Sequence, residues 1–282
     1  MKTTLITGSD GLIGRSLVSK YNINTVQLCD LKTGQDFRSI QIDENVNTVF
    51  HLAAVSRVID ADLDPEYALE INQKSIPDFI ERCGSKRKII LASSKEVFGN
   101  NINEVHEYSP KNPISHYATT KDAMEKIAED FFHQGFNISI IRFSTVFGGM
   151  NDHVTRVIPL FIRQALNDEP LTVIGDNKLI FPTYVDAVTR CVKDFSSQEN
   201  KGNAERIAIR NFVANGILLI DLARLIIKLC NSKSEINILN KDTNYASSML
   251  RTDYSNTALF EWEKSLDLYI RNIEYADRII KN

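Results

Sequence analysis

The sequence of 282 residues lacks a strong charge of either sign and lacks a long uninterrupted apolar run. Its formal net charge of −3 excludes a general electrostatic attraction to nucleic acid or to an anionic membrane surface. The longest apolar stretch, 216–230, is interrupted by Asp221, Arg224 and Lys228, which predicts an amphipathic helix rather than a membrane span. No targeting segment is recognisable, so we expect a cytoplasmic protein.

Cysteine and histidine are few, and neither occurs in a metal-binding pattern. The four cysteines contain no CxxC pair, which favours reduced and mostly buried thiols over a disulfide framework. The five histidines show neither HxH nor HxxxH spacing. We therefore expect no metal site.

What the sequence does contain is an alternation of strand-like and helix-like patterns through its first half. Strands are expected at 2–7, 25–29, 46–52, 88–92 and 137–143, and helices at 12–21, 66–82 and 116–133. Such alternation over short loops predicts an α/β fold, a doubly wound parallel sheet with helices on both faces.

The rhythm loosens after residue 145. Helices are expected at 151–167, 184–195, 217–230 and from about 266, and strands at 171–174 and 206–209. We expect a dinucleotide-binding Rossmann domain at 1–148, to which 182–210 returns. The segments 149–181 and 211–282 would then form a small C-terminal substrate-binding lobe.

A glycine-rich loop follows the first strand. Gly8, Gly11 and Gly14 are spaced three apart between a strand and a helix. One glycine permits the tight turn, one lets backbone amides approach an anion, and one lets helix and strand pack closely. The helix N-terminus favours a pyrophosphate at this place. The loop therefore predicts dinucleotide binding, with a simple glycine-rich turn as the alternative.

Asp30 ends the second strand. A carboxylate there can accept the hydroxyl groups of the adenosine ribose, and it repels a 2′-phosphate, which favours NAD over NADP. Lys32 and Arg38 follow closely in the sequence and leave NADP possible. A turn-forming aspartate is the alternative.

Together these motifs resemble the extended short-chain dehydrogenases, in their branch of NAD-dependent epimerases and dehydratases that mostly act on nucleotide-linked sugars. The resemblance extends to His51-Leu52-Ala53-Ala54, Asn72, 93–99, Tyr117-xxx-Lys121, 142–148 and Tyr184-Val185-Asp186. It implies cofactor contacts from Gly8, Asp10, Gly11, Leu12, Ile13, Asp30, Leu31, Asp36, Phe37, Leu52, Ala53, Ala54, Tyr117 and Lys121.

Tyr117 and Lys121 are four residues apart on an expected helix, so they share one face. A free phenol has a pKa of about 10 and is a poor base at neutral pH. We expect the nearby ammonium and a bound cationic nicotinamide to lower that pKa. The resemblance implies that Lys121 also holds the nicotinamide ribose and that Ser94 binds the reacting oxygen of the substrate. Tyr117 would transfer a proton while the cofactor exchanges a hydride.

Glu96 stands where dehydratases of this family carry an acid–base carboxylate, often preceded by a second acid. Here the preceding residue is Lys95, which disfavours a paired-acid dehydratase. Glu96 can still take a proton beside a carbonyl if desolvation raises its pKa. A solvent-facing or salt-bridged glutamate is the alternative.

Two positions depart from the family pattern for a substrate diphosphate. Thr145 and Ile180 stand where many relatives have asparagine and arginine. Positive charge and substrate contacts could come instead from other arginines, with a surface arginine as the alternative at each. These candidates are Arg57, Arg156, Arg163 and Arg251.

We first predict that the protein is an NAD(P)-dependent oxidoreductase or isomerase. Its expected substrate is a nucleotide-linked sugar, on which it would act as an epimerase or a 4-keto reductase. One alternative is a reductase or dehydrogenase of a carbonyl compound without a nucleotide. Another is a non-enzymatic dinucleotide sensor. The expected partners are a small-molecule substrate and a second copy of the chain, because helices 66–82 and 116–133 correspond to the pair that forms the dimer interface of relatives.

Overall fold

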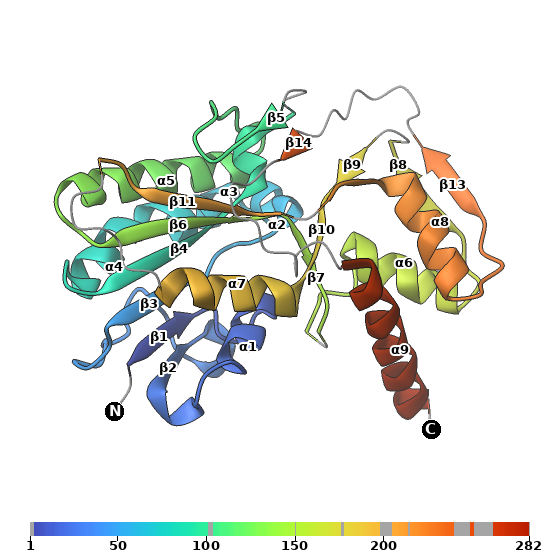
Figure 1. Cartoon of the computed structure of the whole chain (residues 1–282), viewed down its shortest axis with the longest axis horizontal. Helices are drawn as coiled ribbons and strands as arrows, with labels where there is room; N and C mark the ends of the chain where they lie inside the picture. The colour runs from blue at the N-terminus through green and yellow to red at the C-terminus, as the bar shows by residue number, and fades with distance from the viewer. Residues whose placement is uncertain are drawn as a thin grey trace.

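The computed structural model describes residues 3–100, 104–149, 151–175, 178–197, 205–213, 215–239, 249–250 and 262–281. Its centre is a six-stranded parallel sheet in the order β11-β6-β4-β3-β1-β2 (Figure 1). The strands are β1 (Thr4–Thr7), β2 (Val26–Cys29), β3 (Thr48–His51), β4 (Lys88–Ser94), β6 (Ile138–Phe143) and β11 (Ala208–Phe212). The predicted doubly wound Rossmann architecture is confirmed.

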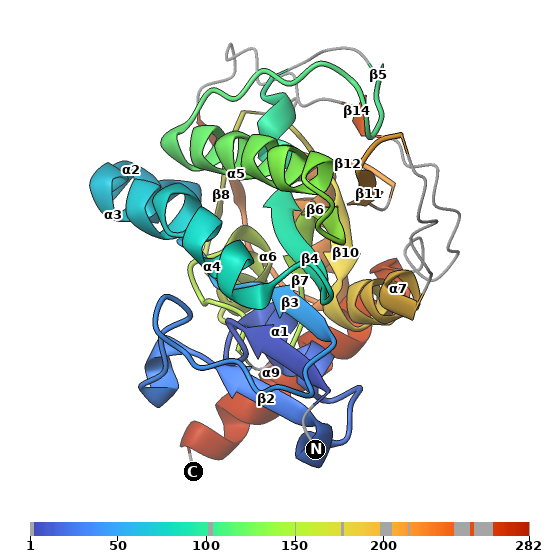
Figure 2. The same ribbon diagram turned by 90° about the vertical axis from the view of Figure 1, so that its left-hand side faces the viewer.

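Helices cover both faces of this sheet (Figure 2). One face carries α1 (Leu12–Val18) and α7 (Val185–Ser197), and the other carries α3 (Pro65–Leu69), the π-helical turn η3 (Glu70–Lys74), α4 (Ile76–Cys83) and α5 (His116–His133). Side chains alternate between these layers along each strand. In β4, Ile89 and Leu91 pack in the core beneath α5, whereas Ile90 packs in the core beneath α7. Burial on both faces explains why the strands are continuous apolar runs.

A second core lies beyond the carboxyl ends of the strands, on the right of Figure 1. It contains α6 (Val157–Leu166), α8 (Leu219–Leu229) and α9 (Trp262–Lys281), with the parallel pair β8 (Leu171–Ile174) and β13 (Ile236–Leu239). Buried side chains of all three helices meet there, among them Phe161, Leu222 and Trp262. The residue boundaries between this lobe and the sheet domain stay a prediction.

The other described strands are short and form three pairs. These pairs are β7 (Thr145–Phe147) with β10 (Pro182–Tyr184), β9 (Leu179–Ile180) with β12 (Ile217–Leu218), and β5 (Glu104–Val105) with β14 (Met249–Leu250). The remaining helical segments are η1 (Ile23–Thr25), η2 (Leu31–Thr33), α2 (Val58–Leu63) and η4 (Lys95–Phe98). Neither α2 nor the strands of these three pairs were predicted.

The expected single helix 66–82 is wrong, because the chain forms α3, η3 and α4 there. Asn72 in the π-helical turn points inward, and its amide exchanges hydrogen bonds of 2.9 and 3.0 Å with the backbone of Val55. Pro77 at the start of α4 has no N–H to continue the helical ladder. An inward asparagine and a proline therefore interrupt a pattern that reads as one helix.

Two other expected helices begin later than predicted. The helix expected from 151 begins at Val157, because Asp152 bonds the Gly148 amide instead and holds an irregular segment. The helix expected from 217 begins at Leu219, because Ile217 pairs with β9.

The final helix begins before the expected residue 266. It starts at Trp262, whose indole is buried in the lobe core. Of the expected first strand, Lys2 lies outside the described residues.

The glycine loop is closely packed at two of its three glycines. Gly8 has a φ of +66°, and a Cβ there would lie 2.7 Å from the amide nitrogen of Ala53. A Cβ on Gly14 would overlap the carbonyl oxygen of Gly8. The start of α1 can therefore pack onto the turn only while both positions lack a side chain.

Gly14→Ala tests this packing. We expect the free energy of unfolding to fall by about 2–3 kcal/mol, because the new methyl group must displace backbone rather than a flexible side chain. Chemical denaturation measures the change. Gly34→Ala is the control, because Gly34 has a φ of +78° but nothing within 4 Å of its Cβ position. It should lose only the left-handed strain of about 1 kcal/mol. Equal losses in the two variants would contradict the steric account.

Candidate active site

A cavity of about 490 Å³ lies at the carboxyl ends of the strands, between the sheet and the lobe. The chain leaves β1 toward β2 on one side and returns to β3 on the other, and ligands of doubly wound sheets bind where the strand order reverses in this way. The cavity wall brings together many of the predicted site residues: Gly8, Gly11, Leu12, Ile13, Leu52, Ala54, Arg57, Ser94, Glu96, Tyr117, Lys121 and Thr145.

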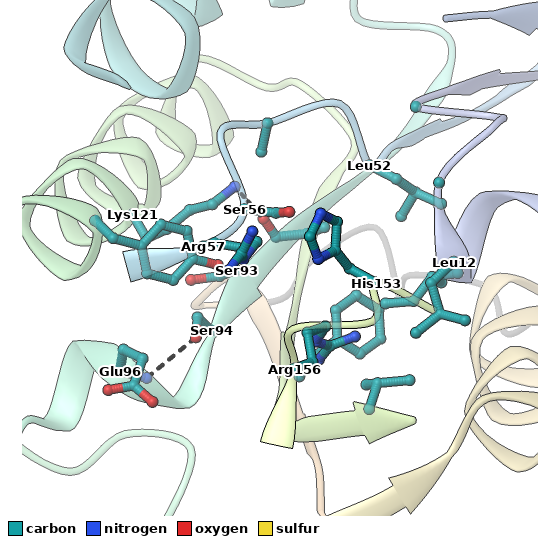
Figure 3. A pocket seen from close by; sticks show the side chains of 18 of the residues that line it. Leu12, Leu52, Ser56, Arg57, Ser93, Ser94, Glu96, Lys121, His153 and Arg156 are labelled. Atoms are coloured by element: carbon teal, nitrogen blue, oxygen red, sulfur yellow. Dashed lines mark hydrogen bonds between the residues drawn. The ribbon is translucent and has the colours of Figure 1, made fainter. Parts of the chain in front are cut away.

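The glycine loop and the catalytic candidates face the same cavity from opposite sides. In Figure 3, Ser94 and Lys121 approach from β4 and α5, while Leu12 lies across the cavity with His153 and Arg156. The α1 helix begins after Gly11, which has no side chain to cap it. The missing side chains leave backbone amides accessible, so the residues present fit a dinucleotide pyrophosphate.

Six predicted cofactor residues do not line the cavity wall: Asp10, Asp30, Leu31, Asp36, Phe37 and Ala53. The carboxylate of Asp30 accepts hydrogen bonds from the backbone amides of Asp10 at 2.9 Å and Lys32 at 3.0 Å, so it shapes both adjoining loops. Asp36 is paired with Arg38. The Phe37 ring is 4% exposed, with its centroid 4.7 Å from that of the His51 ring. Their contacts with a cofactor stay predictions.

Tyr117 and Lys121 lie on the face of α5 that meets the end of β4. Ser115 caps this helix by accepting the Ala118 amide at 3.1 Å. The Tyr117 phenol lies close enough to the Ser94 side chain for that hydroxyl to lower the pKa of the phenol, and the Ser94 hydroxyl accepts the Glu96 amide at 3.2 Å. The predicted trio therefore lines one cavity, with Tyr117 and Ser94 close together.

The expected lowering of the phenol pKa is wrong for the protein alone. Burial raises the pKa of Tyr117 to about 12; the nearby Ser94 side chain and the charge of Arg156 act in the opposite direction, and Glu96 raises it further. The ammonium of Lys121 donates to the carbonyl oxygen of Ala92 at 2.9 Å. Burial lowers the pKa of Lys121 to about 8. Desolvation is therefore the largest cause of both pKa shifts.

Glu96 is the salt-bridged glutamate of the alternative interpretation. Its Oε1 lies 2.8 Å from Nζ of Lys95. Burial raises the pKa of Glu96, but the charge and hydrogen bond of Lys95 and the charge of Lys178 lower it to below the ordinary value. The carboxylate is therefore charged at neutral pH, and the raised pKa that would suit a proton-abstracting base is not found.

The two departures from the family pattern occupy different places. Thr145 faces the cavity. Ile180 is 5% exposed, pairs with Ile217, and packs in the lobe core. Ile180 thus supplies hydrophobic packing at the position where the family resemblance led us to expect an arginine.

The candidate arginines also differ in whether they line the cavity. Arg156 lines the cavity and donates to Asp152 at 3.1 Å. Arg57 lines it too and donates to the Thr155 hydroxyl at 2.9 Å. Arg163 is not on the wall, and Arg251 lies outside the described residues.

Sequence reasoning missed two wall residues in the segment 151–156, Asn151 and His153. Asn151 donates to the carbonyl oxygen of Asp10 at 3.2 Å, which ties this segment to the glycine loop. The signal was present, because Gly148 and Gly149 precede the segment and both adopt positive φ. A Gly-Gly pair marks a turn or loop rather than a helix start.

No group of three histidine, cysteine, aspartate or glutamate side chains among the described residues is placed to hold a metal ion. Within the same part of the chain, no helix has the length and apolar character needed to cross a membrane.

Comparison with known proteins gives a consistent set of similarities. Residues 4–191 match a family model described as "NAD dependent epimerase/dehydratase family". An uncharacterized UDP-glucose epimerase of Bacillus subtilis (strain 168) is 30% identical over 61% of this chain and 58% of its own length. UDP-glucuronic acid decarboxylase 1 of Xenopus tropicalis is 28% identical over 85% of this chain and 63% of its own. The chain thus spans less than two thirds of these relatives' length.

Solved structures share the fold over nearly the whole chain. MoeE5 in complex with UDP-glucuronic acid and NAD superposes with a TM-score of 0.84 at 23% identity, covering 97% of this chain and 99% of that one. UDP-glucose 4-epimerase of Thermotoga maritima, solved with UDP-glucose, has a TM-score of 0.82 at 19% identity, with coverage of 97% and 99%.

Lys95→Met tests the electrostatic description of Glu96. Removing the ammonium leaves burial opposed only by the more distant Lys178, so we expect the pKa of the Glu96 carboxyl to rise. Carboxyl-carbon NMR titration measures it. Lys126→Met serves as the control, since Lys126 is exposed and pairs with Asp122. An unchanged or lower Glu96 pKa in Lys95→Met would contradict the description.

Proposed function

This chain belongs to the NAD dependent epimerase/dehydratase family, and we propose that it is an epimerase of a nucleotide-linked sugar with Tyr117 as its acid–base residue. The expected NAD cofactor is confirmed by the family, which is NAD-dependent. The observation that carries the proposal is the assembly of Ser94, Tyr117 and Lys121 on the wall of the same cavity as the glycine loop. A dinucleotide-binding module without catalysis has no need for a buried phenol, hydroxyl and ammonium at that wall.

Most of the proposed cofactor contacts lie on the cavity wall, and Asp30 lies off it. The backbone amides of Leu12 and Ile13 would bind the pyrophosphate, Asp30 would bind the adenosine ribose, and Lys121 would bind the nicotinamide ribose. When bound, NAD supplies a hydride acceptor and donor for a sugar carbon and a positive charge that favours the phenolate of Tyr117.

Tyr117 and Ser94 act on the same substrate oxygen in this proposal. Their side chains lie close together and face the cavity, so one sugar hydroxyl can contact both. Tyr117 takes the hydroxyl proton during oxidation and returns it during reduction. Ser94 holds the oxygen in place.

One feature favours epimerisation over dehydration. Lys95 is paired with Glu96, so the pair of acids that a paired-acid dehydratase uses is absent at 95–96. Cofactor retention would separate an epimerase from a reductase, because epimerisation has no net redox change, whereas a reductase consumes its reduced cofactor.

Nucleotide sugars are the proposed substrates because MoeE5 was solved with UDP-glucuronic acid and with UDP-glucose, and UDP-glucuronic acid decarboxylase 1 is named for such a substrate. Thr145, Arg57 and Arg156 on the cavity wall are the proposed contacts. Residue Arg251 and the homodimer stay predictions.

Tyr117→Phe tests the proposal. We expect turnover of the substrate found among UDP-glucose, UDP-glucuronic acid and dTDP-glucose to fall by about 10²–10⁴-fold, because the acid–base group is lost. The NAD released by denaturing the purified protein should be unchanged. Chromatography with mass spectrometry measures cofactor and product.

Tyr275→Phe is the matched control, because Tyr275 is an exposed residue of α9. Full turnover in Tyr117→Phe would contradict the proposed role. Stoichiometric consumption of added NADH or NADPH would identify a reductase instead. Failure of UDP and dTDP compounds to raise the melting temperature would favour a carbonyl substrate without a nucleotide. NAD binding with no conversion of any such substrate would favour a sensor.

A further inference from the structure

The end of β4 is bonded to α5 at two consecutive residues, and the next residue, Ser94, lies close to Tyr117. The Ala92 carbonyl accepts from Lys121 at 2.9 Å, and the Ser93 hydroxyl donates to Oε1 of Glu125 at 2.5 Å. The three helix residues, 117, 121 and 125, are each four apart and so lie along one face of α5. Glu125 is the member of this row for which the proposed reaction has no role.

Glu125 is a fixed, buried negative charge. Its side chain is 2% exposed, and Arg142 donates to both carboxylate oxygens at 2.7 and 2.6 Å. Lys111 adds a contact at 3.1 Å, and Ser93 provides the remaining donor. Burial raises the pKa of Glu125, but the hydrogen bonds and charge of Arg142, followed by Lys111 and Ser93, lower it to below its ordinary value. The carboxylate therefore stays ionised.

The ammonium of Lys121 lies among few charged groups. It is 3% exposed. Tyr117 and Glu125 flank it on its own helix, β4 presents the Ala92 carbonyl, and β3 presents His51. Burial lowers the pKa of His51 to about 3, with the charge of Lys121 lowering it further, so the imidazole is neutral. Glu125 is the anion that acts on Lys121.

We propose that Glu125 is a positioning residue of the active site. Its carboxylate holds Ser93, and with it the strand end that carries Ser94, while its charge keeps the buried ammonium of Lys121 protonated. The consequence for cofactor binding rests on the proposed function, in which Lys121 holds a ribose. The effect of Glu125 on the protonation of Lys121 does not depend on that function.

The geometry explains why this residue must be a carboxylate. A protonated lysine is buried only where an opposite charge compensates the loss of water. Burial already lowers the pKa of Lys121 to about 8, and the charge of Glu125 opposes that effect. Without Glu125, the cations Arg142 and Lys111 would be left uncompensated nearby, and they would favour neutral Lys121 still more.

Glu125→Gln tests the proposal, because the amide keeps the size of the side chain and can still accept from Ser93. We expect the titration of Lys121 to move to lower pH, with about a tenfold larger deprotonated fraction at neutral pH. Lysine labelled with carbon-13 and nitrogen-15 reports this by NMR, and the Lys121 signal is assigned by its loss in Lys121→Met. As the pH rises and Lys121 loses its proton, affinity for NAD should weaken, and in Glu125→Gln this loss should begin at a lower pH than in the wild-type protein.

Glu129→Gln is the control, since Glu129 is exposed one turn farther along α5. Lys111→Met is a second variant, and it replaces a partly exposed side chain. It tests the proposal if Glu125→Gln does not fold. It removes a cation that Glu125 shares with Asp122, so the Lys121 titration should move to higher pH.

Opposite displacements in Glu125→Gln and Lys111→Met, with none in Glu129→Gln, would support the proposal. If Glu125→Gln or Lys111→Met folds and leaves the Lys121 titration where it is in the wild-type protein, the proposal is overturned. It is also overturned if Glu129→Gln displaces the Lys121 titration as far as Glu125→Gln does. If the displacements occur while Tyr117→Phe keeps full turnover, the proposed reaction fails and the electrostatic role of Glu125 stands.

Discussion

Lys121 is a charged side chain that is almost completely buried. The cavity wall that carries Ser94, Tyr117 and Lys121 depends on the bonds that make this burial possible. The Lys121 ammonium donates to the end of β4, while Glu125 one turn away carries the compensating charge and is itself paired with Arg142. Breaking a buried pair by removing one partner typically destabilises a protein by about 3–5 kcal/mol, because the other charge is left uncompensated. The contact between α5 and β4 is therefore both a structural joint and the frame of the site.

The parallel sheet brings the glycine loop to this frame. All six strands end at the same edge, so the turn after β1 and the hydroxyl groups at the end of β4 face one cavity although they are far apart in sequence. The lobe closes the other side through Arg156 and the segment tied to Asp10 by Asn151. The proposed dinucleotide binding and the proposed acid–base chemistry thus share a single cavity.

Much of this arrangement was predictable from local patterns. The glycine spacing, the buried strands and the Tyr117–Lys121 spacing depend on neighbours in the sequence, and the fold class and the shared wall followed from them. The break at Asn72 did not, because it arises from a side chain that bonds a distant backbone segment. The direction of the Tyr117 pKa was also missed, because desolvation depends on everything packed around the phenol. Glu125 resembled any polar helix residue until Arg142 was placed beside it.

A crystal structure of the protein with NAD and UDP-glucuronic acid bound tests the central claim most directly. The account predicts that the Tyr117 phenol and the Ser94 hydroxyl lie within about 3.2 Å of one sugar oxygen. It also predicts that the Lys121 ammonium contacts the nicotinamide ribose and that the pyrophosphate lies on the glycine loop. A sugar bound away from Tyr117, or a cofactor whose nicotinamide end does not reach Lys121, would contradict it.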